Sequence, residues 1–193
     1  MNEVIQTMYA RRSVRLYQDR PVPRETVDAL LHAACQAPCG GNTQCWQFLV
    51  LEKDEVKMKL NEAVRLAMLD LELGEYPYKS MVNGKKAAEN PAWKCFLGAP
   101  VWIIIASVEH YPNALNDCAL AASNIMHAAK SLGLDTCWVN QVPWTFRDPR
   151  VMEVLKEYGL EDGRVIGSTV ALGYAAGDGK KPERKEPNVV YVG

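Results

Sequence analysis

The chain has 193 residues, of which 48% are hydrophobic and 23% charged, and its formal net charge is -1. This balance is typical of a globular protein, and a near-neutral charge offers no basic face for nucleic acid. No apolar run is long enough to cross a bilayer, and the N-terminus lacks the pattern of a secretory signal. We therefore expect a single cytoplasmic domain over residues 1–193, with neither a nucleic-acid nor a membrane partner.

In the first half of the chain, apolar residues recur at helical spacing in three stretches. A short apolar run between the second and third stretches has the length of a buried strand. From Gly74 the periodicity fails, and Tyr, Pro and Gly predict an irregular flap or lid at about 74–97. The predicted helices cover residues 2–11, 23–36 and 54–73, and the predicted strand covers residues 46–51.

The second half of the chain alternates strands with helices. Residues 117–132 are apolar on almost every side, which predicts a helix buried in the core or against another subunit. The other predicted elements are strands at 101–108, 136–139, 165–174 and 188–192 and a helix at 149–158. This order favours an α+β sandwich, in which helices flank a small mixed central sheet.

Six cysteines and three histidines are spread along the chain without the spacing of a metal site. No C-x-x-C pair occurs and the histidines lie far apart, so a zinc site is not expected. Most of the cysteines stand within apolar segments. We expect free thiols, with at least four of them buried.

The densest positive charge in the chain lies just after the first predicted helix. Arg11, Arg12 and Arg15 occur with Ser13 in five residues, and three neighbouring guanidinium groups repel one another. Arg is suited to phosphate because its planar fork makes paired charge-assisted hydrogen bonds. The cluster is either a phosphate site or a solvated cationic corner.

Four motifs in sequence resemble those of the nitroreductase family. They are the Arg11–Arg15 segment, the loop Ala37–Trp46, the alanine-rich helix ending in Leu132-Gly133-Leu134, and Ala171-Leu172-Gly173-Tyr174 followed by a basic tail. The family has Ser where this chain has Cys39, and Pro where it has Cys45. Cys39 is either a thiol near the flavin or an inert small residue, and Cys45 leaves an extra backbone N–H in the loop.

The resemblance implies a nitroreductase-like fold and an intertwined homodimer that shares FMN sites between its subunits. It also implies that NAD(P)H supplies electrons to nitroaromatic, quinone or related small acceptors through flavin N5. No side chain is expected to be catalytic, because the flavin carries the chemistry. The resemblance assigns cofactor binding to Arg11, Arg12, Ser13, Arg15, Pro38, Cys39, Gly40, Asn42, Asn140, Gln141 and Arg184.

Within these assignments, the arginines and Ser13 meet the phosphate and ribityl end, with Arg15 at the pyrimidine edge of the ring. The loop from Pro38 comes from the other subunit, and a backbone N–H at Asn140 or Gln141 faces flavin N5. Arg184 is either a further phosphate ligand or part of a solvated basic run.

Two other functions fit the same sequence. Glu72, Tyr76 and Lys94 faintly resemble the lid of reductive dehalogenases of the iodotyrosine type, although their spacing differs. A non-catalytic flavin-binding protein is the second alternative.

Overall fold

The computed structural model describes residues 1–177 and 183–193. The α-helices are α1 (Glu3–Ala10), α2 (Arg24–Ala34), α3 (Asp54–Asp70), α4 (Lys79–Ala88), α5 (Ala114–Ser131), α6 (Gln141–Thr145) and α7 (Pro149–Glu157), and a 3-10 turn, η1, spans Gly40–Asn42. The strands are β1 (Gln47–Leu51), β2 (Val101–Val108), β3 (Asp135–Trp138) and β4 (Arg164–Gly173). In the described part of the chain, no helix is both long and apolar enough to cross a membrane.

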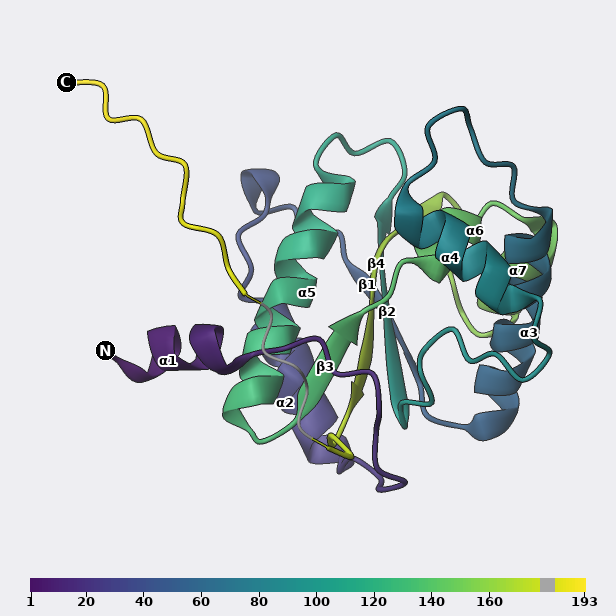
Figure 1. Cartoon of the computed structure of the whole chain (residues 1–193), viewed down its shortest axis with the longest axis horizontal. Coiled ribbons are helices and arrows are strands. Elements are labelled where there is room, and N and C mark those ends of the chain that lie inside the picture. Colours follow the sequence, from purple (N-terminus) through teal and green to yellow (C-terminus); the bar gives the residue numbers. More distant parts are fainter. Residues whose placement is uncertain (178–182) are drawn as a thin grey trace.

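The four strands form one sheet in the order β1-β2-β4-β3, and every neighbouring pair is antiparallel. Helices cover both faces, with α2 and α5 on one side and α3, α4, α6 and α7 on the other (Figure 1). The α+β fold class is therefore confirmed. The sheet is antiparallel rather than mixed, because parallel pairing among the described residues is limited to one isolated bridge between Ser13 and Thr136.

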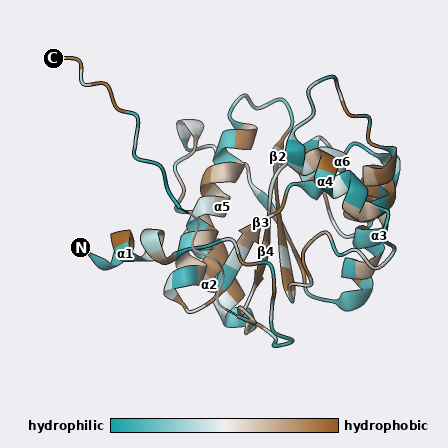
Figure 2. Ribbon diagram, in the orientation of Figure 1, coloured by the Kyte–Doolittle hydropathy of each residue, from teal (hydrophilic) through white to brown (hydrophobic). Residues whose placement is uncertain are grey.

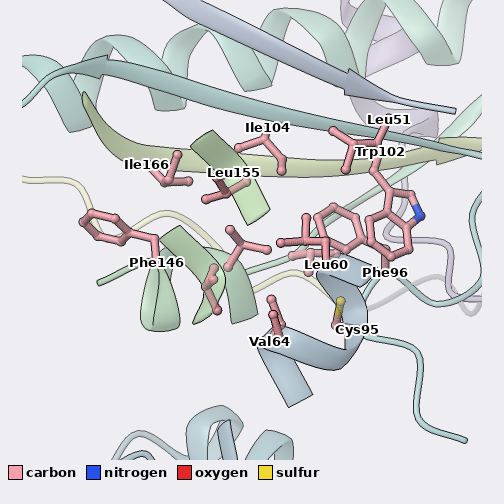
Figure 3. Packing of buried hydrophobic residues seen from close by; sticks show 14 of the residues in the cluster. Leu51, Leu60, Val64, Cys95, Phe96, Trp102, Ile104, Phe146, Leu155 and Ile166 are labelled. Carbon is pink, nitrogen blue, oxygen red and sulfur yellow. The ribbon is translucent and has the colours of Figure 1, made fainter. Parts of the chain in front are cut away.

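The central strand β2 supplies both hydrophobic cores. Its alternate side chains point to opposite faces, so Trp102 and Ile104 join the core under α3, whereas Ile103 and Ile105 join the core under α5. Trp102 stacks on Phe96 with ring centroids 4.1 Å apart (Figure 3). Hydrophobic residues gather along the sheet and polar residues along the outer helical surfaces (Figure 2).

The segment expected to be irregular contains α4, so that part of the prediction is wrong. Asn83-Gly84 looked like a turn, yet Gly84 is buried inside the helix. Side-chain bonds join this segment to α3 and its C-terminal end: Arg65 donates to the Ala88 carbonyl at 3.2 Å and Lys85 to the Leu71 carbonyl at 2.7 Å. The short helix α6 was also missed, because five residues are too few to show helical periodicity.

Apolar faces of three segments lie outside the cores. The predicted helical face of α1 is exposed rather than buried, α5 buries one side but exposes Leu115 and Leu120, and the tail at 183–193 is exposed throughout. The tail forms no strand at 188–192, contrary to prediction, and extends away from the body near α1 (Figure 1). The exposed large side chains of α1 and the tail are Val4, Ile5, Met8, Tyr9, Val189, Val190, Tyr191 and Val192.

Candidate functional site

The Arg11–Arg15 segment is held against the start of β3. Helix α1 ends where the Arg11 N–H donates to the Thr7 carbonyl. The chain then passes along β3, and the Val14 N–H donates to the Thr136 carbonyl at 3.0 Å. The bond to Thr136 thus places the arginines of this segment beside β3, an edge strand of the sheet.

The arginines lie close enough to repel one another. Burial lowers the pKa of Arg11, and the next causes are the charges of Arg184 and Arg12. Arg184 is more than 170 residues away in sequence, so the fold brings the basic tail to the arginine cluster. We call Arg11, Arg12, Arg15 and Arg184 the cationic cluster.

The cationic cluster has no carboxylate partner within the parts of the chain that the structure describes. All ion pairs found there involve other residues. Arg12 donates to the carbonyls of Tyr9 and Arg11, and Arg15 donates to the Ser13 carbonyl. An anion with several acceptor oxygens would relieve the repulsion, and this fits the phosphate end of FMN.

Strand β3 connects the cationic cluster with α6. Cys137 lies beside Arg15 and Arg11, and burial is the main cause that raises the pKa of its thiol. At the end of the strand, Trp138 Nε1 donates to Asn140 Oδ1 at 2.6 Å. Asn140 and Gln141 begin α6, where the first N–H groups have no partner within the helix. Asn140 Oδ1 is thus occupied, and the first backbone N–H groups of α6 can face a ligand.

The loop containing η1 adopts an unusual backbone. Gly41, Asn42 and Gln44 have φ angles of 60°, 55° and 49°, in the left-handed region that side chains disfavour. A Cβ atom at Gly40 would lie only 2.4 Å from Tyr111 Oη. A side chain at residue 40 would therefore force the ends of the Tyr111 and Asn113 side chains to move.

Within one chain, the cationic cluster and the η1 loop lie at different ends of α5. Tyr111, just before α5, contacts the loop at Gly40 and also Asp117 in the first turn of α5. His127, ten residues beyond Asp117, feels the charge of Arg11, which together with burial lowers its pKa. Ten helical residues span about 15 Å. The predicted site residues of one chain therefore form two separate groups along α5 (Figure 1).

Helix α4 covers the side of α6 that carries Gln141. A Cβ at Gly84 would lie 3.0 Å from Met68 Cε and 3.8 Å from Gln141 Nε2. Tyr78, just before α4, meets Trp144 edge to face, with centroids 6.2 Å apart. The segment at 74–97 thus borders the predicted N5 contact.

Comparisons with known proteins identify the family. The sequence model of the nitroreductase family matches residues 8–174. The chain belongs to this family.

Three relatives show how far this likeness extends. A nitroreductase from Bacteroides fragilis, crystallised with bound FMN, is 30% identical, and the alignment covers 100% of this chain and 99% of that one with a TM-score of 0.88. Chloronitrobenzene nitroreductase from Comamonas testosteroni is 31% identical, with 86% of this chain and 83% of the relative covered. Iodotyrosine deiodinase from Danio rerio is 26% identical, with 96% and 65% covered.

The cysteines at which this chain departs from the family pattern are partly accessible. All six thiols are free, but only Cys95, Cys118 and Cys137 are buried, so the expectation of at least four was too high. Cys39 and Cys45 are half-buried because the η1 loop lies at the surface. The Cys45 carbonyl accepts from Arg164 Nη1 at 2.6 Å, which ties the end of the loop to β4.

Several residues that shape this nitroreductase site were missed in the sequence. Tyr111, Trp138 and Gly84 contact predicted site residues, and Asp117 contacts Tyr111. The contacts of Tyr111 with Gly40 and of Gly84 with Gln141 join segments far apart in sequence, whereas Trp138 and Asn140 are only two residues apart. In the sequence, only the turn-like Asn83-Gly84 pair pointed to one of these residues. In the structure, Gly84 allows close packing of helices rather than a turn.

Proposed function

We propose that the protein is an FMN-dependent oxidoreductase that passes electrons from NAD(P)H to nitroaromatic, quinone or related small acceptors. The observation that carries the proposal is the cationic cluster, which has no carboxylate partner among the described residues and fits a phosphate. Two relatives support the proposal: the FMN-bound nitroreductase of B. fragilis and the chloronitrobenzene nitroreductase of C. testosteroni. Bound FMN would supply the hydride chemistry.

The residues of the cationic cluster have different tasks in this proposal. Arg11, Arg12 and Arg184 bind the phosphate, and Ser13 lies at the ribityl end. Arg15, beside Cys137, faces the pyrimidine edge of the ring. A fixed guanidinium there stabilises the negative charge that develops on the ring when it is reduced. The backbone N–H groups at Asn140 and Gln141 face N5.

A homodimer would bring the two groups of site residues together. In the proposed arrangement, Pro38, Cys39, Gly40 and Asn42 of one subunit meet the cationic cluster of the other. The exposed apolar faces of α1, α5 and the tail support this arrangement, because large apolar surfaces of this kind mark interaction sites. The separation of the two groups along α5 supports it independently.

Mixed dimers test the shared site. Arg11→Glu and Asn42→Asp should each weaken FMN binding at both sites of a homodimer. When the two variants are unfolded together and refolded, each mixed dimer has one doubly damaged site and one intact site. With random pairing, about a quarter of all sites should regain native FMN affinity and reduction by NAD(P)H.

Two controls make this experiment decisive. A mixture of Arg11→Glu with Arg12→Glu should restore nothing, because both changes damage the same half of the site. Mass spectrometry verifies that mixed dimers form. If the first mixture restores no FMN sites although mixed dimers are present, the shared site is wrong. A bound flavin that NADH and NADPH fail to bleach without oxygen would indicate the non-catalytic alternative.

The residues proposed for the dehalogenase alternative lie at the surface of the molecule. Glu72, Tyr76 and Lys94 are all exposed, and the side chain of Tyr76 is 89% exposed. The aromatic pair Tyr78 and Trp144 lies nearer the proposed flavin site, because Trp144 and Gln141 approach the same point of α4. We therefore assign the acceptor side of the site to this pair, which suits flat aromatic acceptors.

A further inference from the structure

Tyr111 connects the η1 loop to α5 through one hydroxyl group. Its oxygen lies 3.1 Å from the Gly40 carbonyl oxygen and 2.9 Å from Asp117 Oδ2. The Asp117 side chain is buried, with 5% of the residue exposed, and it has no ion-pair partner among the described residues. A buried carboxyl group without such a partner needs hydrogen bonds, and Tyr111 provides one.

Apart from Tyr111, the loop is held by hydrogen bonds of its own, including Gln44 Nε2 to Asn42 Oδ1 at 3.1 Å, and by Arg164 at its end. Within it, the Asn42 N–H donates to Cys39 and the Thr43 N–H donates to Gly40, both at 3.2 Å. These two bonds close a single turn that contains two residues with positive φ, Gly41 and Asn42. Such a backbone persists only where its surroundings hold it. The hydroxyl of Tyr111 meets the same Gly40 carbonyl that closes the turn.

The Tyr111 hydroxyl has one proton and two neighbouring oxygens. A tyrosine hydroxyl donates one hydrogen bond, yet both of its oxygen neighbours are acceptors when Asp117 is a carboxylate. The single hydroxyl proton is therefore shared between the Gly40 carbonyl and Asp117. An amide at residue 117 can donate to the Tyr111 oxygen, which leaves the hydroxyl proton for Gly40.

We propose that Tyr111 and Asp117 form a positioning pair that holds the η1 loop in the shape needed for FMN. This inference rests on the proposed function, because it assigns the pair a role in that same cofactor site. The pair does not touch the cofactor. It acts through Gly40, and in the shared site it acts on the flavin bound mainly by the other subunit.

Hydrogen exchange of the apo protein tests the anchor without FMN. Tyr111→Phe retains the ring but removes the hydroxyl, so the amides of Asn42 and Thr43 should exchange faster. The dissociation constant for FMN should rise about 3- to 10-fold, the range expected for one lost hydrogen bond. Tyr158→Phe, at the C-cap of α7, is the matched control and should change neither quantity.

Asp117→Asn supplies a conservative substitution at the second member of the pair. The amide can donate to Tyr111 while Tyr111 donates to Gly40, so exchange of the loop and FMN affinity should stay within about twofold of the wild type. Asp117→Ala removes the contact that orients the Tyr111 hydroxyl, so loop exchange and the FMN dissociation constant should rise, but less than in Tyr111→Phe, because the hydroxyl can still meet Gly40. Rescue by asparagine but not alanine would separate hydrogen bonding from general packing.

Two results would overturn the positioning pair. One is unchanged loop exchange in Tyr111→Phe, and the other is a loss in Asp117→Asn equal to that in Asp117→Ala. Failure of the wild type to bind FMN would instead overturn the proposed function. In that case the exchange of the apo variants still decides whether the pair anchors the loop.

Discussion

The cationic cluster and the η1 loop differ in the interactions that dominate them. The cluster gathers like charges that repel one another, and burial with the charges of Arg184 and Arg12 lowers the pKa of Arg11. The loop gathers close steric contacts and neutral backbone bonds, and its fit depends on the absence of a side chain at Gly40. Charge dominates the first region, whereas shape dominates the second.

This difference indicates separate roles in holding one ligand. An anion would neutralise the unpaired positive charges of the cluster, so the cluster suits the phosphate end of FMN. A rigid loop with exposed backbone suits the flat ring, because it can approach closely without a charged side chain. Variants of the two regions should therefore differ in how much FMN affinity they lose and in how that loss depends on salt. They should also differ in their effect on the pKa of His127.

The largest effect is expected from the cationic cluster. Arg11→Gln should weaken FMN binding by about 2 kcal/mol, or about 30-fold, because it removes charge-assisted bonds to the phosphate. Arg147→Gln, at an exposed arginine paired with Glu109, is the matched control. Fluorescence titration of FMN measures both. Equal small losses in the two variants would remove Arg11 from the phosphate site.

A smaller effect is expected in the loop, and it should depend on which glycine is changed. Gly40→Ala forces Tyr111 and Asn113 to move and should weaken FMN about tenfold, since overpacking typically costs 1–3 kcal/mol. Gly41→Ala meets no close neighbour and suffers mainly from its φ of 60°, at about 1 kcal/mol. FMN titration compares them, and a greater loss in Gly41→Ala would contradict the steric account.

Salt should separate the two regions further. Raising the ionic strength from 0.1 to 1 M shortens the Debye length from about 10 to about 3 Å, so wild-type FMN affinity should fall severalfold. The loss caused by Arg11→Gln should shrink, whereas the loss caused by Gly40→Ala should stay constant. FMN titrations of the three proteins at both salt concentrations measure this. Parallel salt dependence of both variants would show that charge does not distinguish the regions.

The smallest effect is a shift in the titration of His127. Burial and then Arg11 lower its pKa in the apo protein. Because the unfolded chain binds this proton more readily, the contribution to stability is present above about pH 6.5 and is lost as pH falls through the lowered pKa. A phosphate on Arg11 offsets the repulsion, so FMN binding should raise the pKa of His127.

NMR titration of the histidines measures this shift. His32, exposed on α2, serves as the internal control and should not respond to FMN. Arg11→Gln should raise the apo pKa of His127 by itself. If FMN binds tightly but leaves His127 unchanged, its phosphate does not lie at Arg11.

Local patterns in the sequence predicted most of the fold. The strand at 101–108 and the helix from Asp54 follow from apolar spacing, because side chains alternate along strands and recur every 3.6 residues along helices. The arginine cluster was visible because its members are adjacent. These features depend only on residues that are close in sequence, so the sequence alone is enough to predict them.

The tertiary structure alone decided how distant segments meet. Arg184 joins Arg11, and Tyr111 meets Gly40 across 71 residues, with no local pattern to predict either contact. Helix α4 was hidden because Gly84 usually weakens a helix, yet here its missing side chain lets α4 pack against α3 and α6. The exposed apolar face of α1 could not be predicted for the same reason. The spacing of apolar residues predicts a helix, but the surfaces that the fold brings near it decide whether that face is covered.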